Sequence, residues 1–191
     1  MATVIPVHGG PLSSCSYIIQ DEIKCWIVDC GDYPALKTHL KVPIEAILLT
    51  HGHFDHIKGL NELLDHYPTV RIYTNEFGKE MLINPKKNLS HYHESDFSLK
   101  IPSCINLIRD RQEVKLGNNI SAIPVFTPGH NPSCITWIID NAIFTGDSYI
   151  PECKIVTNLP DGNKKDAYES IRLIKELSLG RVIYPGHNIT I

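Results

Sequence analysis

Short runs of hydrophobic residues, separated by glycine, proline and polar positions, dominate the first part of the chain. Runs of this length and spacing are typical of β-strands joined by turns. The last of them is almost wholly apolar, as expected for a strand that is covered on both faces. The strands predicted in this part cover residues 4–7, 17–20, 24–29 and 44–50, with a helix at 35–40.

Helical and strand-like patterns alternate in the remainder of the chain. Asn75 and Asn163 are suited to cap the starts of two helices, and Gly180 is suited to end the second of these. The predicted helices cover residues 60–67, 75–82 and 164–179. The predicted strands cover residues 70–73, 113–116, 120–126, 134–140, 142–145 and 181–184. This alternation indicates the α/β class.

Residues 84–104 interrupt this alternation. They contain two prolines, charges of both signs and little periodicity, so we expect an exposed loop inserted into the scaffold. The chain shows no internal repeat and no linker-like stretch. We therefore expect residues 1–191 to form a single domain.

Composition and charge narrow the class of protein. Hydrophobic residues make up 42% of the chain, and the net charge is −3, which argues against both a disordered chain and a nucleic-acid partner. No apolar run approaches the roughly 18 residues of a membrane helix. The first 20 residues lack a charged and then apolar leader, which predicts a cytoplasmic protein.

The six cysteines include no C-x-x-C pair. In a cytoplasmic chain of this length, buried thiols are expected rather than a disulfide framework. Cys30, which follows Asp29, is interpreted in the same way, as a structural thiol.

Four potential metal ligands lie within six residues, directly after the predicted strand 44–50. They are His51, His53, Asp55 and His56. In extended backbone, residues two apart project to the same side, so His51 and His53 can bind one ion. Imidazole and carboxylate suit zinc, iron or manganese, whereas purely structural zinc sites consist mostly of cysteines. The motif therefore predicts a catalytic metal site.

Four further candidates follow other predicted strands, and each lies beside a glycine. They are Asp29, His130, Asp147 and His187. Glycine allows sharp turns and a close approach of the backbone. Loops at the ends of strands can meet at one edge of a sheet, so we expect these residues to share a pocket with the first cluster.

The order of these motifs resembles the metallo-β-lactamase superfamily of metal-dependent hydrolases. The motifs are V-D-x-G at 28–31, T-H-x-H-x-D-H at 50–56, T-P-G-H at 127–130, T-G-D at 145–147 and P-G-H at 185–187. The resemblance implies an αβ/βα four-layer sandwich, in which two mixed β-sheets are flanked by helices. It also implies a binuclear metal centre at one edge of the sheets.

The same resemblance assigns roles to the candidate residues. The implied ligands are His51, His53 and His130 for the first metal, Asp55, His56 and His187 for the second, and Asp147 as a bridge between the two. Asp29 would support the loop that carries the first ligands. The implied cofactors are two divalent ions, zinc first, with iron or manganese as alternatives.

Within the superfamily, the pattern is most similar to glyoxalase II and related thioester hydrolases. Asp147 occupies the bridging position at which antibiotic-hydrolysing members typically place cysteine, and residues 158–162 resemble a segment of small glyoxalase-like members. The implied reaction is attack on the carbonyl of a thioester or related ester by a hydroxide that bridges the metals. Asp55 would be the catalytic residue, by orienting that hydroxide.

Several alternatives stay open at this point. The same ligands could hold a single iron for redox chemistry, as in relatives that resemble persulfide dioxygenase, or serve a lactonase. Tyr149, His91 and His93 could donate a proton to a leaving group. For Tyr149, packing against the core is as plausible, and for the two histidines a solvated loop is favoured. The pattern does not predict the oligomeric state.

Overall fold

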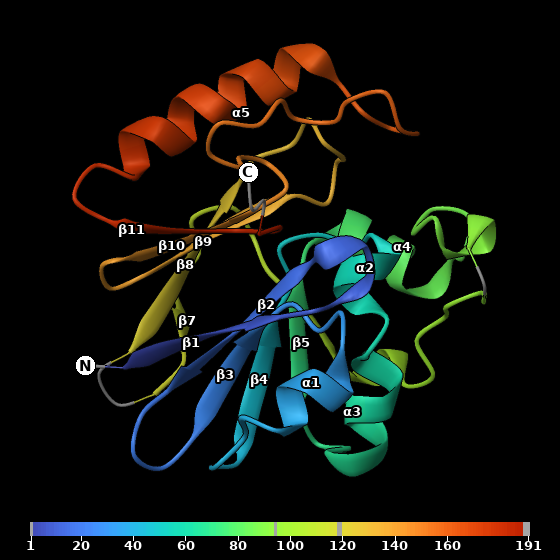
Figure 1. Cartoon of the computed structure of the whole chain (residues 1–191), viewed down its shortest axis with the longest axis vertical. Coiled ribbons are helices and arrows are strands. Elements are labelled where there is room, and N and C mark those ends of the chain that lie inside the picture. Colours follow the sequence, from blue (N-terminus) through green and yellow to red (C-terminus); the bar gives the residue numbers. More distant parts are fainter. Residues whose placement is uncertain (1, 94, 118–119, 189–191) are drawn as a thin grey trace.

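Two mixed β-sheets face each other, and helices cover their outer faces (Figure 1). The structure, a computed structural model, describes residues 2–93, 95–117 and 120–188. The α/β four-layer sandwich that the sequence predicts is confirmed. The prediction of a single domain over residues 1–191 stays a prediction.

The first sheet has the strand order β1-β2-β3-β4-β5-β6. Its strands are β1 (Thr3–His8), β2 (Cys15–Gln20), β3 (Cys25–Val28), β4 (Ile44–Leu48), β5 (Arg71–Thr74) and β6 (Ile105–Leu107). β1, β2 and β3 pair antiparallel, and β3 to β6 pair parallel. The parallel strands therefore end at the same edge of the sheet.

The second sheet has the order β11-β10-β9-β8-β7. Its strands are β7 (Val114–Lys115), β8 (Ser121–Phe126), β9 (Ile135–Ile139), β10 (Ala142–Gly146) and β11 (Val182–Pro185). β7 to β10 pair antiparallel, whereas β11 pairs parallel with β10. A two-residue hairpin turn, Asp140 and Asn141, joins β9 to β10, and Asp140 has a φ of 51°.

The α-helices are α1 (Tyr33–Lys37), α2 (Phe54–Ile57), α3 (Leu60–His66), α4 (Glu76–Ile83) and α5 (Lys164–Leu177). Three 3₁₀ turns accompany them, at Pro11–Ser13, Ser90–Tyr92 and Pro102–Cys104. The two predicted caps are confirmed, because the Asn75 side chain accepts from the Gly78 amide and the Asn163 side chain accepts from the Lys165 amide.

Apolar side chains fill three layers. Ile27 and Ile47 of the first sheet pack against the helices that cover it, α1 and α3. Trp26 and Trp137 belong to the layer between the two sheets. Ile174 of α5 packs on the second sheet. Burial of apolar surface in all three layers holds both sheets, and so the edge that carries the candidate ligands, in fixed positions.

Some predicted element boundaries are wrong. The helix expected at 35–40 covers 33–37, because the Asp32 side chain caps it and proline occupies its first turn. The strand expected to reach Thr50 ends at Leu48. The structure also adds two short elements that were not expected, α2 and β6.

Residues 84–104 contain only two 3₁₀ turns in their described part, which leaves out residue 94. The expectation of an exposed loop is wrong at four positions. The side chains of Asn88, Ser90, Phe97 and Leu99 are buried. Asn88 donates to the carbonyl oxygens of Met81 and Phe97, which ties the segment to α4. The segment is therefore anchored at several points.

All six cysteines are free, and four of them are buried, as expected. Cys30 has no exposed surface, and burial raises the pKa of its thiol well above the ordinary value. Among the described residues, no helix combines the length and the hydropathy needed to cross a membrane. The cytoplasmic location stays a prediction.

Candidate metal centre

The predicted site residues come together at one edge of the two sheets. His51 and His53 lie just beyond the end of β4, and Asp55 and His56 lie in α2, which follows. His130, Asp147 and His187 lie beyond the ends of β8, β10 and β11, respectively. Strand ends from both sheets therefore supply the same cluster, although 136 positions separate its first residue from its last.

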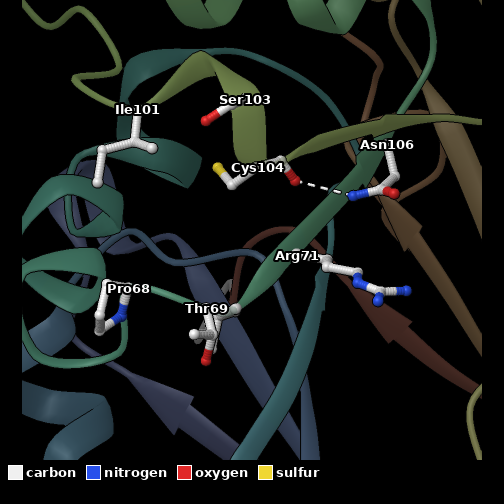
Figure 2. A pocket seen from close by; sticks show the side chains of 8 residues that line it. Pro68, Thr69, Arg71, Ile101, Ser103, Cys104 and Asn106 are labelled. Atoms are coloured by element: carbon white, nitrogen blue, oxygen red, sulfur yellow. Dashed lines mark hydrogen bonds between the residues drawn. The ribbon is translucent and has the colours of Figure 1, made fainter.

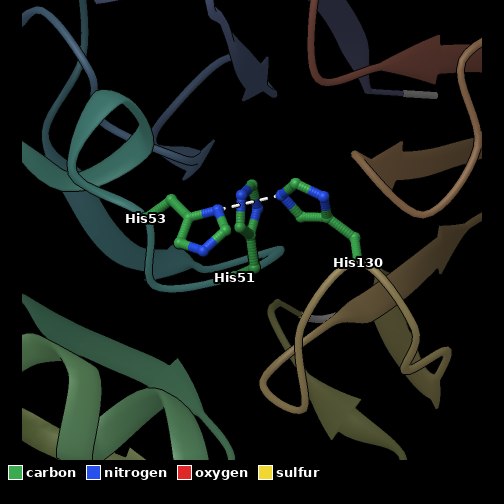
Figure 3. A group of neighbouring side chains, drawn as sticks. All are labelled: His51, His53 and His130. Atoms are coloured by element: carbon green, nitrogen blue, oxygen red, sulfur yellow. Dashed lines mark hydrogen bonds between the residues drawn. The ribbon is translucent and has the colours of Figure 1, made fainter. Parts of the chain in front are cut away.

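His51, His53 and His130 form what we call the first triad (Figure 3). One ligand atom from each lies within 4.8 Å of the other two. His53 Nδ1 lies 2.9 Å from His130 Nε2, and the His51 ring lies between these two residues in the figure. All three side chains are buried.

Hydrogen bonds turn particular ring nitrogens of the first triad inward. His51 Nδ1 lies 3.1 Å from Thr50 Oγ1, whose own hydrogen is donated to Asp29 at 2.6 Å. His130 Nδ1 donates to the Val156 carbonyl oxygen at 2.8 Å. A neutral imidazole that donates through Nδ1 keeps a lone pair on Nε2. His51 Nε2 is buried and has no hydrogen-bond partner among the described residues, as a metal ligand requires.

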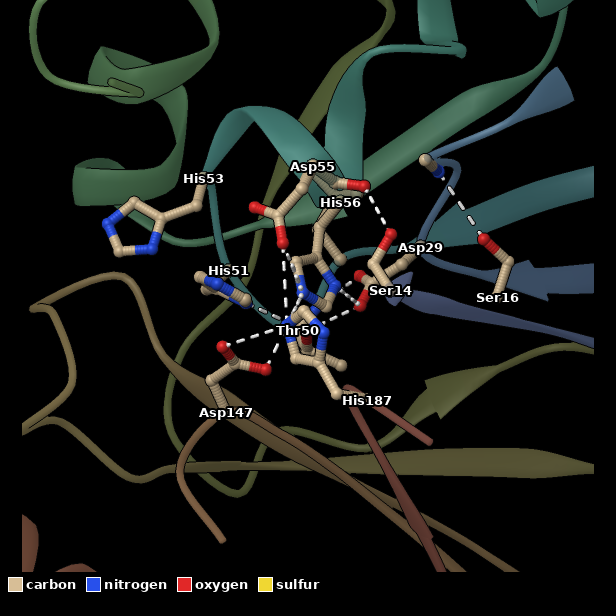
Figure 4. A network of polar contacts seen from close by, with 12 residues as sticks. Ser14, Ser16, Asp29, Thr50, His51, His53, Asp55, His56, Asp147 and His187 are labelled. Atoms are coloured by element: carbon tan, nitrogen blue, oxygen red, sulfur yellow. Dashed lines mark hydrogen bonds and ion pairs between the residues drawn. The ribbon is translucent and has the colours of Figure 1, made fainter. Parts of the chain in front are cut away.

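Asp55, His56 and His187 form the second triad (Figure 4). Asp55 Oδ2 lies 3.4 Å from His187 Nε2 and 3.5 Å from His56 Nε2, and these two nitrogens lie 3.4 Å apart. His187 Nδ1 donates to the Leu12 carbonyl oxygen at 3.1 Å. The Nε2 atoms of both histidines therefore face the carboxylate.

Asp147 lies between the two triads. Its Oδ2 is 3.3 Å from His187 Nε2 and 3.5 Å from His130 Nε2, and its Oδ1 is 3.5 Å from His56 Nε2. It thus contacts one histidine of the first triad and two of the second. This is the place that a bridging carboxylate would occupy.

Asp29 fixes the base of the cluster from behind. Its Oδ1 accepts from the Thr50 amide at 2.7 Å, and its Oδ2 accepts from His56 Nδ1 at 2.8 Å. The residue has a φ of 58°, a conformation that aspartate and asparagine tolerate better than most side chains. One buried carboxylate therefore orients His56 directly and His51 through Thr50.

Two serines that sequence reasoning missed hold the ligand loops in place. The Gly52 amide, between His51 and His53, donates to Ser133 Oγ at 3.0 Å. Ser14 Oγ donates to the Asp55 carbonyl oxygen at 2.7 Å, and Ser14 also forms a β-bridge with His187. No local pattern could reveal these contacts, because Ser133 is 81 positions from Gly52 and Ser14 is 41 positions from Asp55 along the chain.

Burial sets the protonation of two first-triad histidines. Desolvation, together with the nearby His56, holds the pKa of His51 well below its ordinary value. Desolvation and the neighbouring His130 lower the pKa of His53 to about 3. Both rings are therefore neutral at neutral pH, the state in which imidazole binds a metal.

Carboxylates dominate the second triad. Burial lowers the pKa of His56, but the charge of Asp55 and hydrogen bonds to Asp147 and Asp29 outweigh it and hold the pKa well above its ordinary value. For His187, hydrogen bonds to Asp147 and Asp55 outweigh burial and raise the pKa to about 9. Burial raises the pKa of Asp147, but hydrogen bonds from His187 and His56 hold it well below its usual range. Burial also raises the pKa of Asp55, but the charge of His56 and the hydrogen bond from His187 outweigh it and lower the pKa below its ordinary value.

This donor set fits divalent metal ions. His51 and His53 offer neutral nitrogen atoms, and Asp55 and Asp147 offer carboxylates that stabilise positive charge, here as protons on His56 and His187. Zinc, iron and manganese all accept such mixed nitrogen and oxygen ligands. Every residue that the sequence singled out as a metal ligand lies in the cluster, and their roles as ligands are taken up as a proposal below.

None of the three candidate proton donors belongs to either triad. Tyr149 packs with the apolar layer beneath α5, with Lys175 Nζ 5.8 Å from its ring centre. His91 is exposed and lies 3.1 Å from Asp96. His93 is also exposed, and its ring stacks on Phe54 at 3.9 Å between centroids. For Tyr149 the structure shows packing against the apolar layer, one of the two alternatives left open, and the exposure of His91 and His93 is as predicted.

A polar pocket of about 500 Å³ lies away from the cluster (Figure 2). Arg71, Cys104 and Asn106 contribute to its lining, so it lies where β5 and β6 begin. The candidate ligands follow the opposite end of the neighbouring parallel strand, β4. This pocket is therefore not part of the metal centre.

Known proteins share both the sequence and the fold of this chain. A sequence model described as the metallo-beta-lactamase superfamily matches residues 9–187. A probable metallo-hydrolase of Streptococcus pyogenes, M6_Spy0554, is 31% identical over 180 residues, which cover 90% of this chain and 77% of the relative. The probable polyketide biosynthesis zinc-dependent hydrolase PksB of Bacillus subtilis is 30% identical over 183 residues, which cover 90% of this chain and 72% of PksB.

A hydroxyacylglutathione hydrolase of Pectobacterium carotovorum is 30% identical over 175 residues. The match covers 89% of this chain but only 59% of that relative. Two solved structures share the fold. BLEG-1, a B3 metallo-beta-lactamase, has a TM-score of 0.84 at 24% identity, covering 98% of this chain and 92% of its own. TTHA1623, in a di-iron-bound form, has a TM-score of 0.80 at 22% identity, and the match covers 97% of this chain and 92% of TTHA1623. The superfamily match spans nearly the whole chain, and the protein belongs to the metallo-beta-lactamase superfamily.

Proposed function

We propose that this protein is a hydrolase with two divalent metal ions, zinc foremost, that cleaves a thioester or a related ester of a small molecule. The observation that carries the proposal is the meeting of two complete ligand triads at one carboxylate, Asp147. A structural metal site needs four ligands at most, whereas seven inward-facing groups suit a reactive centre. The relatives named hydroxyacylglutathione hydrolase favour the thioester within this class.

In this proposal, His51, His53 and His130 hold one ion, and Asp55, His56 and His187 hold the other, with Asp147 shared. Such a pair would polarise a substrate carbonyl and lower the pKa of a bound water. The protein then needs no serine or cysteine nucleophile. A thiolate leaves without protonation, so cleavage of a thioester does not require Tyr149 as a proton donor.

The residues of the chain orient the reactants. Asp55 is ionised at neutral pH, because the charge of His56 and the hydrogen bond from His187 hold its pKa low despite burial. Its carboxylate can therefore accept a hydrogen bond, or a proton, from the attacking water. Asp29 keeps His56 in the tautomer that presents Nε2 to the centre.

A single-iron oxidoreductase and a lactonase use related ligand sets. The second triad weighs against a single ion, because its three ligand atoms face one another without help from the first. A lactone is an ester, so a lactonase would differ in the substrate pocket rather than in the metal centre.

One experiment tests the proposal. The protein is purified without chelator, its metals are quantified, and it is assayed against thioesters, lactones and phosphoesters. We expect two metal ions per chain and the fastest turnover with thioesters. One iron per chain, with oxygen consumption and no hydrolysis, would refute the proposal.

A further inference from the structure

A second pocket, of about 650 Å³, lies beside the metal centre. Its lining includes Phe54, whose neighbours in the chain are the candidate ligands His53 and Asp55. It also includes Pro11, which precedes the residue whose carbonyl oxygen accepts from His187. No candidate ligand lines the pocket itself, but Phe54 is bonded in the chain to two of them, and Pro11 is bonded to the residue that holds His187. The volume of the pocket is that of a typical small-molecule site.

The segment 84–104 builds the outer wall of this pocket. Ser90, His93 and Phe97 of the segment contribute to the lining. The Phe54 amide donates to the Asn88 carbonyl oxygen at 2.9 Å, so the segment is bonded to the residue between two candidate ligands. The wall therefore has a fixed position relative to the metal centre.

The lining joins an apolar floor to a basic rim. Phe54 and Phe97 are largely buried and supply the floor. Among the charged side chains of the rim, Asp96 lies 3.1 Å from His91, and Lys100 lies 3.2 Å from Asp65. Lys58, which follows α2, is exposed, and its ammonium group has no hydrogen bond or ion pair with any described residue. Lys58 is thus a cation of the rim that a ligand can bind without displacing another partner among the described residues.

We propose that this pocket selects substrates with an anionic group, a carboxylate, several atoms from the bond that is cleaved. Lys58 binds the carboxylate. The apolar part of the substrate, between the carboxylate and the cleaved bond, lies against Phe54 and Phe97. Lys58 is thus a specificity-determining residue, and Ser90, His93 and residues 95–98 form the wall of the substrate pocket. The inference rests on the hydrolase proposal above.

The test compares two thioesters of N-acetylcysteamine that have the same shape. The first carries an adipoyl group with a free terminal carboxylate, and in the second this carboxylate is replaced by an uncharged amide. We expect the carboxylate compound to have the higher kcat/KM, by about fivefold, the size of a partly exposed charge contact. Lys58→Gln should remove this preference, because kcat/KM for the carboxylate compound should fall to that for the amide compound. Lys79→Gln is the matched control, because Lys79 is exposed on α4 and does not line the pocket. A third compound is an acetyl thioester that carries the carboxylate on its thiol side. Its kcat/KM, compared with that of the adipoyl compound, shows whether the pocket binds the acyl side or the thiol side of the cleaved bond.

Binding to the metal-free protein separates this inference from the hydrolase proposal. The probes are thioether analogues of the two compounds, which cannot be hydrolysed, and their dissociation constants are measured by calorimetry. Tighter binding of the carboxylate probe, lost in Lys58→Gln and weakened by added salt, supports the inference even if no thioester is cleaved. Equal binding of both probes, or a carboxylate preference that survives Lys58→Gln, would overturn it whatever the activity.

Discussion

The two triads occupy the same cluster but differ in how they keep their charge. In the first triad, burial holds two imidazoles neutral, and their lone pairs are ready for a cation. In the second triad, carboxylates keep both histidines protonated until a cation displaces the protons. The same residue type, histidine, is therefore prepared for metal binding in two ways, and the neighbouring carboxylates decide which.

The triads also differ in what fixes them. Ser133 and Val156, both in the second half of the chain, hold the first triad. Ser14 and Leu12 of the N-terminal turn hold the second. Asp29 contacts His56 of the second triad directly and His51 of the first through Thr50, and Asp147 links the two triads. Substitutions at these supports can therefore weaken one triad at a time.

The largest effect is expected from Asp55→Asn, which removes the carboxylate of the second triad. Asparagine cannot take up a proton, so kcat should fall by about 10² to 10⁴-fold. The measurement is kcat with metal quantification. Asp140→Asn is the control, because Asp140 is exposed in the β9–β10 turn and asparagine tolerates its positive φ. Turnover near that of the wild type with full metal content would contradict the role of Asp55.

Asp29→Asn sharpens the comparison, because it acts on both triads unequally. Asparagine fits the positive φ of this position but loses the charge that orients His56. Metal affinity should fall by about 10 to 100-fold, and more at the second triad than at the first. A two-site titration with cobalt or zinc measures both affinities. Equal losses of affinity at the two sites would contradict this, because they would mean that Asp29 orients His51 through Thr50 as strongly as it orients His56 directly.

The pH dependence of metal binding should differ between the triads. His187 has a pKa of about 9 before metal binds, against an ordinary value of 6.5, so binding below pH 9 must release its proton. Affinity at the second triad should rise with pH up to about 9, by about tenfold per pH unit for each proton released. At the first triad, neutral histidines predict little change above pH 6.

Calorimetry in buffers of different ionisation enthalpy counts the released protons. The raised pKa also stabilises the metal-free fold, fully below pH 6.5 and progressively less as the pH rises through 9. Metal binding without proton release at pH 7, or metal-free stability that increases from pH 6.5 to 9, would contradict the charge assignment of the second triad.

The smallest effects are expected at the two serines. Ser133→Ala leaves the Gly52 amide without its partner, and Ser14→Ala does the same to the Asp55 carbonyl. Each should lower the free energy of unfolding by about 1–3 kcal/mol. Ser133→Ala should weaken only the first metal site and Ser14→Ala only the second, so each variant is the control for the other. Equal weakening of both sites by either variant would show that the triads are one unit.

The sequence predicted the parts of this molecule that local pattern determines. The apolar run before His51, the caps at Asn75 and Asn163, and the ligands beside glycines all follow from neighbouring residues. The four residues of α2 and the three of β6 are too short to show a period, so only tertiary packing reveals them.

Long-range supports of the site were also beyond prediction. Ser133 and Val156 contact residues more than 25 positions away, and nothing in their own neighbourhoods marks them. The segment 84–104 has a loop-like composition, yet Asn88 is buried because it bonds to Phe54 of α2 and Met81 of α4, and it holds the buried Phe97 in turn. Composition indicated the lack of regular structure but not the anchoring.

The most direct test of the two-triad centre is a crystal structure of the metal-loaded protein with anomalous scattering. We predict two anomalous peaks, one at His51, His53 and His130 and the other at Asp55, His56 and His187, with Asp147 contacting both. A single peak, or two peaks with Asp147 turned away from the cluster, would contradict the account.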